Sequence, residues 1–256
     1  MKKSRLDELL VTRGLVETRS KAKALIMSGN VLVNDVPQEK SGTLISVEAI
    51  IRLREQLRYV GRGGLKLEKA LAEFGILVSD KTCLDVGAST GGFSDCLLQH
   101  GAKKVYAIDS GQNQLHWKLK KDPRVVCLEK ENFRYFETTR ITDPIDVAVM
   151  DVSFISCKIL IPKIVEVFKN SPGHKTFVLL IKPQFEVGKE EVGKGGIVRE
   201  ENLRQRVVND ITNFCIQLNL NNPQVIPSPI TGADGNVEFL LFTTLAWPLA
   251  AIATKS

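Results

Sequence analysis

The chain has 256 residues, 43% of them hydrophobic, and carries 35 lysines and arginines against 29 acidic residues. This length allows one large domain or a large and a small one, and the composition is that of a globular protein with a core. The five cysteines contain no CxxC pair and the amino terminus lacks the apolar stretch of a signal peptide, which argues against a secreted, disulfide-stapled protein. We therefore expect reduced, buried thiols and a cytoplasmic location.

Two short helices and two short strands are predicted within about the first 50 residues. Ser4 and Asp7 have the S-x-x-D spacing of a capping box, and leucines follow at helical spacing. Thr18 can cap the second helix. The predicted strands lie near 31–33 and 43–47, with a turn at Asn34-Asp35.

The excess positive charge lies in the first quarter of the chain. Residues 1–66 contain 13 lysines and arginines against 7 acidic residues, whereas residues 67–256 contain 22 of each. Arg19 and Lys23 are four residues apart and share a helix face, as cations that contact successive RNA phosphates would. A solvated helix face is the alternative. The RNA contacts that we predict are Arg5, Arg19, Lys21, Lys23 and Arg62.

The segments RLDELLVTRGL and TRSKAKALIMSGNVLVND resemble the S4-type RNA-binding domain, from residue 3 to about 47. The resemblance implies an RNA partner. A charged linker, IRLREQLRYVGRG, follows at residues 51–63. We therefore expect a small α+β domain with its linker at 1–58 and a second domain at 59–256.

The second region alternates strand and helix signals in the manner of a doubly wound fold. Five strands are nearly continuous apolar runs, as expected for strands covered on both faces, and the last two predict a reversed hairpin. We predict an α/β fold with a mostly parallel, seven-stranded Rossmann-like sheet. The predicted strands are 82–86, 105–109, 125–128, 145–151, 177–182, 224–227 and 237–244, and the predicted helices are 65–74, 92–100, 156–169 and 200–218.

The sequence DVGASTGGFSD, beginning at Asp85, reads as a strand end, a glycine turn and a helix start. Such glycines let the backbone approach a ligand, but their spacing is neither G-x-G-x-x-G nor that of a P-loop. Asp109 could accept both hydroxyls of an adenosine ribose or only cap a strand end, and Asn132 could contact the adenine or only form a turn. The predicted cofactor-binding residues are Asp85, Gly87, Ala88, Ser89, Gly91, Gly92, Phe93, Asp109, Asn132 and Asp151.

The residues at the strand ends also bear on the reaction. If the cofactor donates a methyl group, these residues indicate which kind of atom accepts it. An amine acceptor needs an [ND]-P-P-[YF] segment and a pyrimidine carbon needs a cysteine beside a proline, and the chain has neither at this place. A hydroxyl acceptor needs a base or a positive field. Lys182 ends one apolar strand and Asp151 ends its predicted neighbour, so their side chains should meet. The predicted catalytic residues are Lys66, Asp151, Lys182 and Glu238, and two structural ion pairs are the alternative.

Residues 60–245 resemble the FtsJ-type ribose methyltransferases, and their combination with an S4-type domain resembles the TlyA family, often labelled hemolysin A. The matching stretches are YVGRGGLKL, DVGASTGGFSDCLLQHGA, DVSFIS, LIKPQFE, GKGGIVRE and SPITGADGNVEFL. The resemblance implies 2′-O-methylation of cytidine in ribosomal RNA, S-adenosylmethionine as cofactor, and the four catalytic residues above as a tetrad. The implied partner is ribosomal RNA or a ribosomal subunit. Two positions depart from the family pattern, Gly61 in place of a serine and Asn113 in place of a glycine.

Two other functions stay open at this point, a membrane-active hemolysin and a non-catalytic RNA-binding protein. The longest charge-free run, Phe239 to Thr254, is short for a membrane span of roughly 20 residues and contains Pro248. We expect a final strand with a packed tail there, and no stable membrane association. No metal site is predicted. The loop from Gly188 to Gly196 could close over RNA or be simply mobile.

Overall fold

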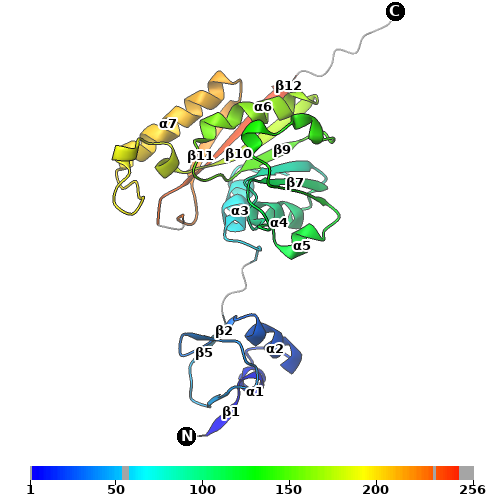
Figure 1. The fold of residues 1–256 in the computed structure, drawn as a ribbon, viewed down its shortest axis with the longest axis vertical. Helices are drawn as coiled ribbons and strands as arrows, with labels where there is room; N and C mark the ends of the chain where they lie inside the picture. The colour runs from blue at the N-terminus through cyan, green and yellow to red at the C-terminus, as the bar shows by residue number, and fades with distance from the viewer. Residues whose placement is uncertain (1, 54–57, 233–234, 248–256) are drawn as a thin grey trace, which may run out of the picture. The chain divides into compact units, whose positions relative to one another are not determined.

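The computed structural model describes residues 2–53, 58–232 and 235–247 (Figure 1). The chain divides into two compact units, Met1–Leu57 and Arg58–Ser256. The tail predicted after the last strand lies outside the described residues. No helix in the described ranges combines the length and the apolar character that a bilayer crossing requires.

The first unit packs two helices against short antiparallel strands. Leu6, Leu10 and Ile26 are fully buried in its core. One sheet pairs β1 with β4, and the other has the order β3-β2-β5. Its elements are β1 (Lys3–Arg5), α1 (Leu6–Thr12), α2 (Arg19–Met27), β2 (Val31–Val33), β3 (Val36–Gln38), β4 (Leu44–Ser46) and β5 (Ile51–Leu53).

Local predictions for this unit were partly wrong. The capping box at Ser4 is absent, because Arg5 occupies the N-cap position and no side chain caps α1. Asp7 is instead buried. The predicted linker is also shorter at its start, since Ile51–Leu53 pairs with β2 as strand β5. The Thr18 cap is confirmed by the hydrogen bond that its Oγ1 accepts from the Lys21 backbone N–H at 3.2 Å.

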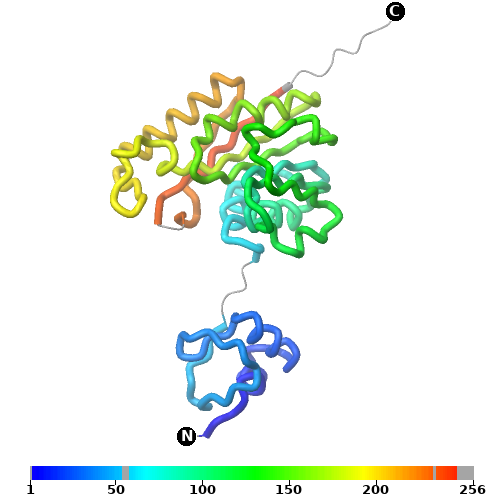
Figure 2. The backbone as a smooth tube through the Cα atoms, in the orientation of Figure 1, coloured from blue at the N-terminus to red at the C-terminus, as the bar shows by residue number. Residues whose placement is uncertain are grey.

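The second unit is built on a seven-stranded sheet in the order β11-β12-β10-β9-β6-β7-β8. All neighbours from β10 to β8 are parallel, and β12 is antiparallel to both β10 and β11. The trace of the chain shows this late strand running inside the sheet (Figure 2). The strands are β6 (Thr82–Val86), β7 (Lys104–Asp109), β8 (Val125–Glu129), β9 (Val147–Met150), β10 (Gly173–Ile181), β11 (Asn221–Pro227) and β12 (Phe239–Trp247).

Helices cover both faces of this sheet, which confirms the doubly wound prediction. Alternate side chains of β6 show why: Leu84 faces one apolar cluster and Cys83 faces the other. The first cluster contains residues of α6 (Ile161–Lys169) and α7 (Glu201–Gln217). The second contains residues of α3 (Gly63–Glu73), α4 (Gly92–Gln99) and the loop and short helix α5 (Trp117–Lys120).

Candidate active site

The glycine turn between β6 and α4 is shaped by close backbone contacts. Gly87 has φ +81°, and a Cβ there would lie 2.4 Å from the carbonyl oxygen of Asp151 at the end of β9. Gly91 has φ +95°, and a Cβ there would lie 2.1 Å from Leu119 Cδ1. Both positions therefore require glycine for backbone conformation and for packing against neighbouring elements.

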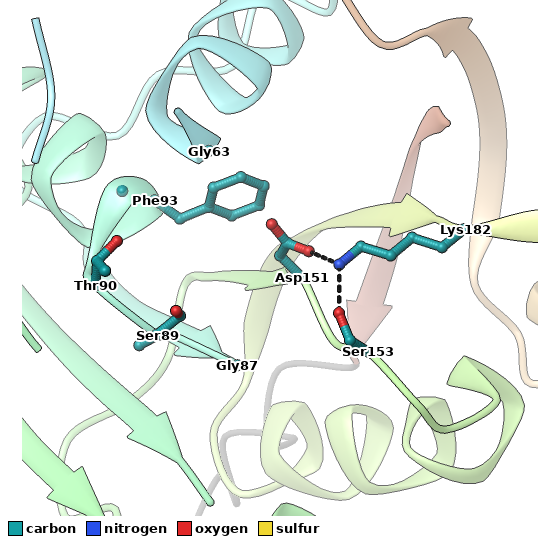
Figure 3. Close-up of a pocket in the computed structure, with 10 residues that line it drawn as sticks. Gly63, Gly87, Ser89, Thr90, Phe93, Asp151, Ser153 and Lys182 are labelled. Atoms are coloured by element: carbon teal, nitrogen blue, oxygen red, sulfur yellow. Dashed lines mark hydrogen bonds and ion pairs between the residues drawn. The ribbon is translucent and has the colours of Figure 1, made fainter. Parts of the chain in front are cut away.

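Gly92 brings the start of α3 against the start of α4. A Cβ at Gly92 would lie 2.9 Å from the backbone nitrogen of Gly64. The segment before α3 is fixed to the same helix, because Asp95 Oδ2 accepts a hydrogen bond from the Val60 N–H at 2.8 Å. This contact places Gly63 beside the turn (Figure 3).

Two pockets at the carboxyl ends of the strands share walls and form one groove. Their shared wall is Gly87, Ser89, Asp151 and Ser153. The first end is also lined by Gly63, Ala88, Thr90, Gly92, Phe93 and Lys182. The second end is also lined by Val86, Ile108, Asp109, Ser110, Glu131, Asn132, Phe133, Val152, Phe154, Ile155 and Leu160.

The groove contains most of the residues predicted to bind a cofactor, but two lie behind its wall. Asp85 is fully buried and Gly91 packs on Leu119, and neither lines the groove. Asp85 and Gly91 therefore support the groove from behind, and their predicted contact with a cofactor stays a prediction.

Asp85 remains an unusual group. Its Oδ2 accepts a hydrogen bond from Ser94 Oγ at 2.6 Å, while its Oδ1 is buried without a partner. Burial, opposed by the Ser94 hydrogen bond and assisted by the charge of Asp151, raises the pKa of Asp85 to about 7. The carboxyl group therefore titrates near neutral pH.

Asp109 and Asn132 line the groove and also hold the backbone around it. Asp109 Oδ2 accepts from the Ser89 N–H at 2.8 Å and its Oδ1 from the Gly111 N–H at 2.7 Å. Asn132 Oδ1 accepts from the Arg134 N–H at 3.0 Å. Each carboxylate oxygen of Asp109 keeps a second lone pair, so these bonds leave it able to accept from a ligand.

Lys182 and Asp151 meet at the ends of the parallel neighbours β10 and β9, as their strand ends predicted (Figure 3). Lys182 Nζ lies 2.6 Å from Asp151 Oδ1, in an ion pair whose angles are not those of a hydrogen bond. The same ammonium donates a hydrogen bond to Ser153 Oγ at 2.8 Å. Ser153 was not predicted, and only its place two residues after Asp151 could have suggested it.

Lys66 and Glu238 form the second pair, with Nζ to Oε2 at 2.5 Å and both side chains at least nine-tenths buried. Lys66 lies on α3, one turn after Gly63. Glu238 directly precedes β12, and the pairing of Ile181 with Phe239 puts it beside Lys182 at the shared end of two strands. The second pair therefore lies behind the first at the strand ends, and neither Lys66 nor Glu238 lines the groove.

An exposed aromatic side chain stands beside these charges. Phe154 has φ +65° and is 90% exposed, and its ring contacts that of Phe185 at 5.0 Å between centroids. A left-handed conformation is costly for a bulky residue, so its loop must be held by its surroundings. Glu186 holds it, because its carboxylate accepts from Ser156 Oγ at 2.6 Å and from the Cys157 N–H at 2.7 Å.

The predicted RNA-binding cations differ in what they contact. Arg5 and Arg19 both hydrogen bond to the carboxylate of Asp7, and these bonds, that from Arg5 first, lower the pKa of Asp7 to about 2. Lys21 pairs with Glu17 at 3.3 Å on an exposed surface. In the described residues Lys23 has no polar partner, whereas Arg62 donates to the Thr231 carbonyl at 3.1 Å.

The loop from Gly188 to Gly196 is fixed at three points. Arg206 pairs with Glu191 at 2.6 Å, and Gly193 forms an isolated bridge with Ile197. Asn236 donates from Nδ2 to the Gly196 carbonyl at 2.8 Å and accepts from the Val198 N–H at 3.0 Å. These contacts tie the loop to the segment that leads into Glu238.

Comparison with known proteins gives consistent matches for both units. The family model described as FtsJ-like methyltransferase matches residues 59–245, and that of the S4 domain matches residues 4–51. The chain is 46% identical to Hemolysin A of Brachyspira hyodysenteriae, over 92% of this chain and 98% of that protein. It is 41% identical to the 16S/23S rRNA (cytidine-2′-O)-methyltransferase TlyA of Mycobacterium tuberculosis, over 94% of this chain and 90% of that protein. The solved structure of a candidate hemolysin from Streptococcus thermophilus superposes with a TM-score of 0.72 at 43% identity, covering 99% of this chain and 93% of that one.

Proposed function

The chain belongs to the FtsJ-like methyltransferase family, and on that premise we propose that it methylates ribose 2′-hydroxyls of ribosomal RNA using S-adenosylmethionine. The observation that carries the proposal is the contact of Lys182 with Asp151 beside the glycine turn. A lysine held by a carboxylate at a strand end suits a hydroxyl acceptor, because a hydroxyl becomes nucleophilic only as it loses its proton. One relative is named for this reaction on cytidine.

The groove fits S-adenosylmethionine in chemistry and in layout. Its second end combines apolar walls from Ile108 and Phe133 with the carboxylate of Asp109, which suits an adenosine with two ribose hydroxyls. Its first end is formed by turn backbone and by Asp151, which suits an amino acid and a sulfonium. When bound, the cofactor would supply a methyl group on a positively charged sulfur.

The residues at the first end would then align and activate the acceptor. The 2′-oxygen would take the methyl group from the cofactor, which would leave as the neutral thioether, while the hydroxyl proton would pass to the Lys182 amine. Lys182 would hold the 2′-oxygen and assist the loss of this proton, while Asp151 and Ser153 orient the ammonium. Lys66 and Glu238 would keep the site close to charge balance and hold the ribose.

The thiols give a second argument about the acceptor. Methylation of a pyrimidine carbon would need a thiolate nucleophile near the cofactor. Cys157 is the cysteine nearest to Asp151 in sequence, and it is buried. Burial, assisted by the neighbouring carboxylate of Glu186, raises the pKa of Cys157 far above neutral pH. A hydroxyl acceptor therefore fits better than a pyrimidine carbon.

The first unit would bind the RNA. It matches the S4 domain and carries Lys21 and Lys23 on exposed helix positions. We propose ribosomal RNA or a ribosomal subunit as partner and the cytoplasm as the place of reaction. Family and site favour this over a membrane-lytic activity or a non-catalytic RNA-binding role.

The proposal is tested by incubating the protein with ribosomal subunits and methyl-labelled S-adenosylmethionine, then mapping 2′-O-methyl groups on the RNA. We expect a new methyl group at a defined cytidine 2′-oxygen. We expect none in the control reaction from which S-adenosylmethionine is left out. The proposal would be contradicted by label that is found only on RNA bases. It would also be contradicted if no label reached the RNA although calorimetry shows that the protein binds the cofactor. The same mapping in cells with and without the gene identifies the native position.

A further inference from the structure

The short helix α5 presents an exposed aromatic side chain with cations around it. Trp117 is 59% exposed, and Lys121 Nζ lies 5.3 Å from its ring centroid. Residues 116–124, HWKLKKDPR, hold four lysines and arginines against one aspartate, in a region whose overall charge is balanced. An exposed tryptophan with cations is the composition of surfaces that stack bases of single-stranded RNA.

Two of these cations are neutralised and two are not. Lys120 pairs with Glu129 at 2.8 Å, and Arg124 pairs with Asp122 at 2.7 Å. Lys118 and Lys121 are exposed and have no acidic partner among the residues that the structure describes. The net positive charge on this surface therefore belongs to two lysines that flank Trp117.

The helix is rigidly attached to the cofactor turn. The His116 N–H donates to the carbonyl of Thr90, a groove residue, at 3.1 Å, and Leu119 packs on Gly91. Glu129 accepts from the backbone N–H groups of Gln114 and Leu115 at 2.8 and 3.0 Å. The residue before Trp117 is thus bonded to a groove residue, while the Trp117 side chain itself is exposed.

We propose that Trp117, with Lys118 and Lys121, forms a second RNA contact surface, on the methyltransferase unit itself, that stacks an unpaired base near the target nucleotide. The inference rests on the proposed function, since it assumes an RNA substrate at the groove. It adds that the catalytic unit binds RNA directly, through stacking and phosphate contacts that are separate from the S4-type unit.

The test compares variants in RNA binding, cofactor binding and methylation. Trp117→Ala should weaken binding of the ribosomal RNA substrate by about 5–50-fold, while Trp117→Phe should keep most of the affinity because it keeps a stacking face. The double variant Lys118→Ala/Lys121→Ala should lower the slope of log affinity against log salt by about 1. Calorimetry should show unchanged affinity for S-adenosylmethionine in all of them.

Matched controls come from the amino-terminal ends of two strands, opposite to the groove, and from another exposed apolar residue. Lys81→Ala/Lys103→Ala removes two exposed lysines before β6 and β7, and Leu77→Ala removes an exposed apolar side chain. Both controls should bind RNA like the unmodified chain. Equal losses in the controls and in the α5 variants would overturn the proposed surface.

A direct reading of stacking uses fluorescence. Trp247→Phe leaves Trp117 as the only tryptophan, and its emission should fall on addition of RNA with the same midpoint as binding. Unchanged emission together with full RNA affinity of Trp117→Ala would refute the inference. Failure of the proposed function can be told apart from failure of the proposed RNA contact surface. In the first case the unmodified chain would transfer no methyl group to RNA at all.

Discussion

Lys182 is the residue whose loss should affect chemistry more than binding. Its ammonium contacts Asp151 and Ser153 where the groove meets the strand ends. Lys182→Ala should lower the single-turnover rate by roughly 10²–10⁴, with little change in RNA or cofactor affinity, because the interaction acts mainly in the transition state. Lys182→Arg should also be slow, since a guanidinium does not readily give up a proton. Near-normal single-turnover rates in Lys182→Ala would make the ion pair structural.

Asp85 should make stability depend on pH. Its pKa rises from 3.8 to about 7 on folding, so the folded state binds the extra proton between these values. The contribution of Asp85 to the free energy of unfolding should therefore be fully present below about pH 4 and fall by about 4 kcal/mol as pH rises to 7. Asp85→Asn mimics the neutral carboxyl group and should flatten this decline. Denaturant unfolding at pH 5 and pH 8 measures the free energy of unfolding at each pH. An equal decline between the two pH values in the unmodified protein and in Asp85→Asn would exclude Asp85 as its origin.

At the scale of elements, Glu186 links the loops that follow β9 and β10. Glu186→Gln keeps one oxygen acceptor in place of two, so the Phe154 loop loses part of its support. We expect a loss of roughly 5–30-fold in kcat/KM for RNA, as for one buried hydrogen bond, with cofactor affinity unchanged. Glu190→Gln, on the exposed loop nearby, is the matched control and should be neutral. A Glu186→Gln enzyme with unchanged RNA kinetics would show that the link is not needed.

Sequence patterns predicted the sheet better than its surroundings. Apolar runs placed β6 at Thr82–Val86 and predicted the final hairpin, because strands buried on both faces carry a strong local signal. The Ser4 capping box failed because the Asp7 carboxylate pairs instead with Arg5, two residues before it, and with Arg19 on the next helix.

In the candidate site, too, some contacts could be predicted from the sequence and others could not. The meeting of Lys182 and Asp151 followed from two strand ends, since parallel neighbours end at one edge. The burial of Asp85 and the packing of Gly91 against Leu119 could not be predicted from the sequence, because both depend on contacts with distant segments. Phe154 gave no signal, as its left-handed backbone and exposure exist only in the folded loop. The roles of the tetrad stay predictions.

At the scale of the whole molecule, we expect RNA affinity to depend on the first unit and cofactor affinity to depend on the second unit. Removing residues 2–57 leaves Arg58, whose carbonyl accepts from Gln99 at 3.0 Å, and Val60 attached to α4. Such a chain should keep its affinity for S-adenosylmethionine but bind RNA more weakly and with a shallower salt dependence, because residues 2–57 carry 10 lysines and arginines against 7 acidic residues. RNA titrations at several salt concentrations check this. Equal RNA affinity at every concentration would show that the first unit does not contribute to binding.

The shared wall of the groove has a consequence for inhibitor design. Gly87, Ser89, Asp151 and Ser153 line both of its ends, so the two ends meet along these four residues. One compound that joins an adenosine, placed at the second end, to an acceptor nucleoside placed beside Lys182 would bridge the cofactor and acceptor positions through a short linker. Its affinity should exceed that of either fragment, because the second fragment binds at a high effective concentration. A series of linker lengths with one clear optimum would measure the distance between methyl donor and acceptor directly.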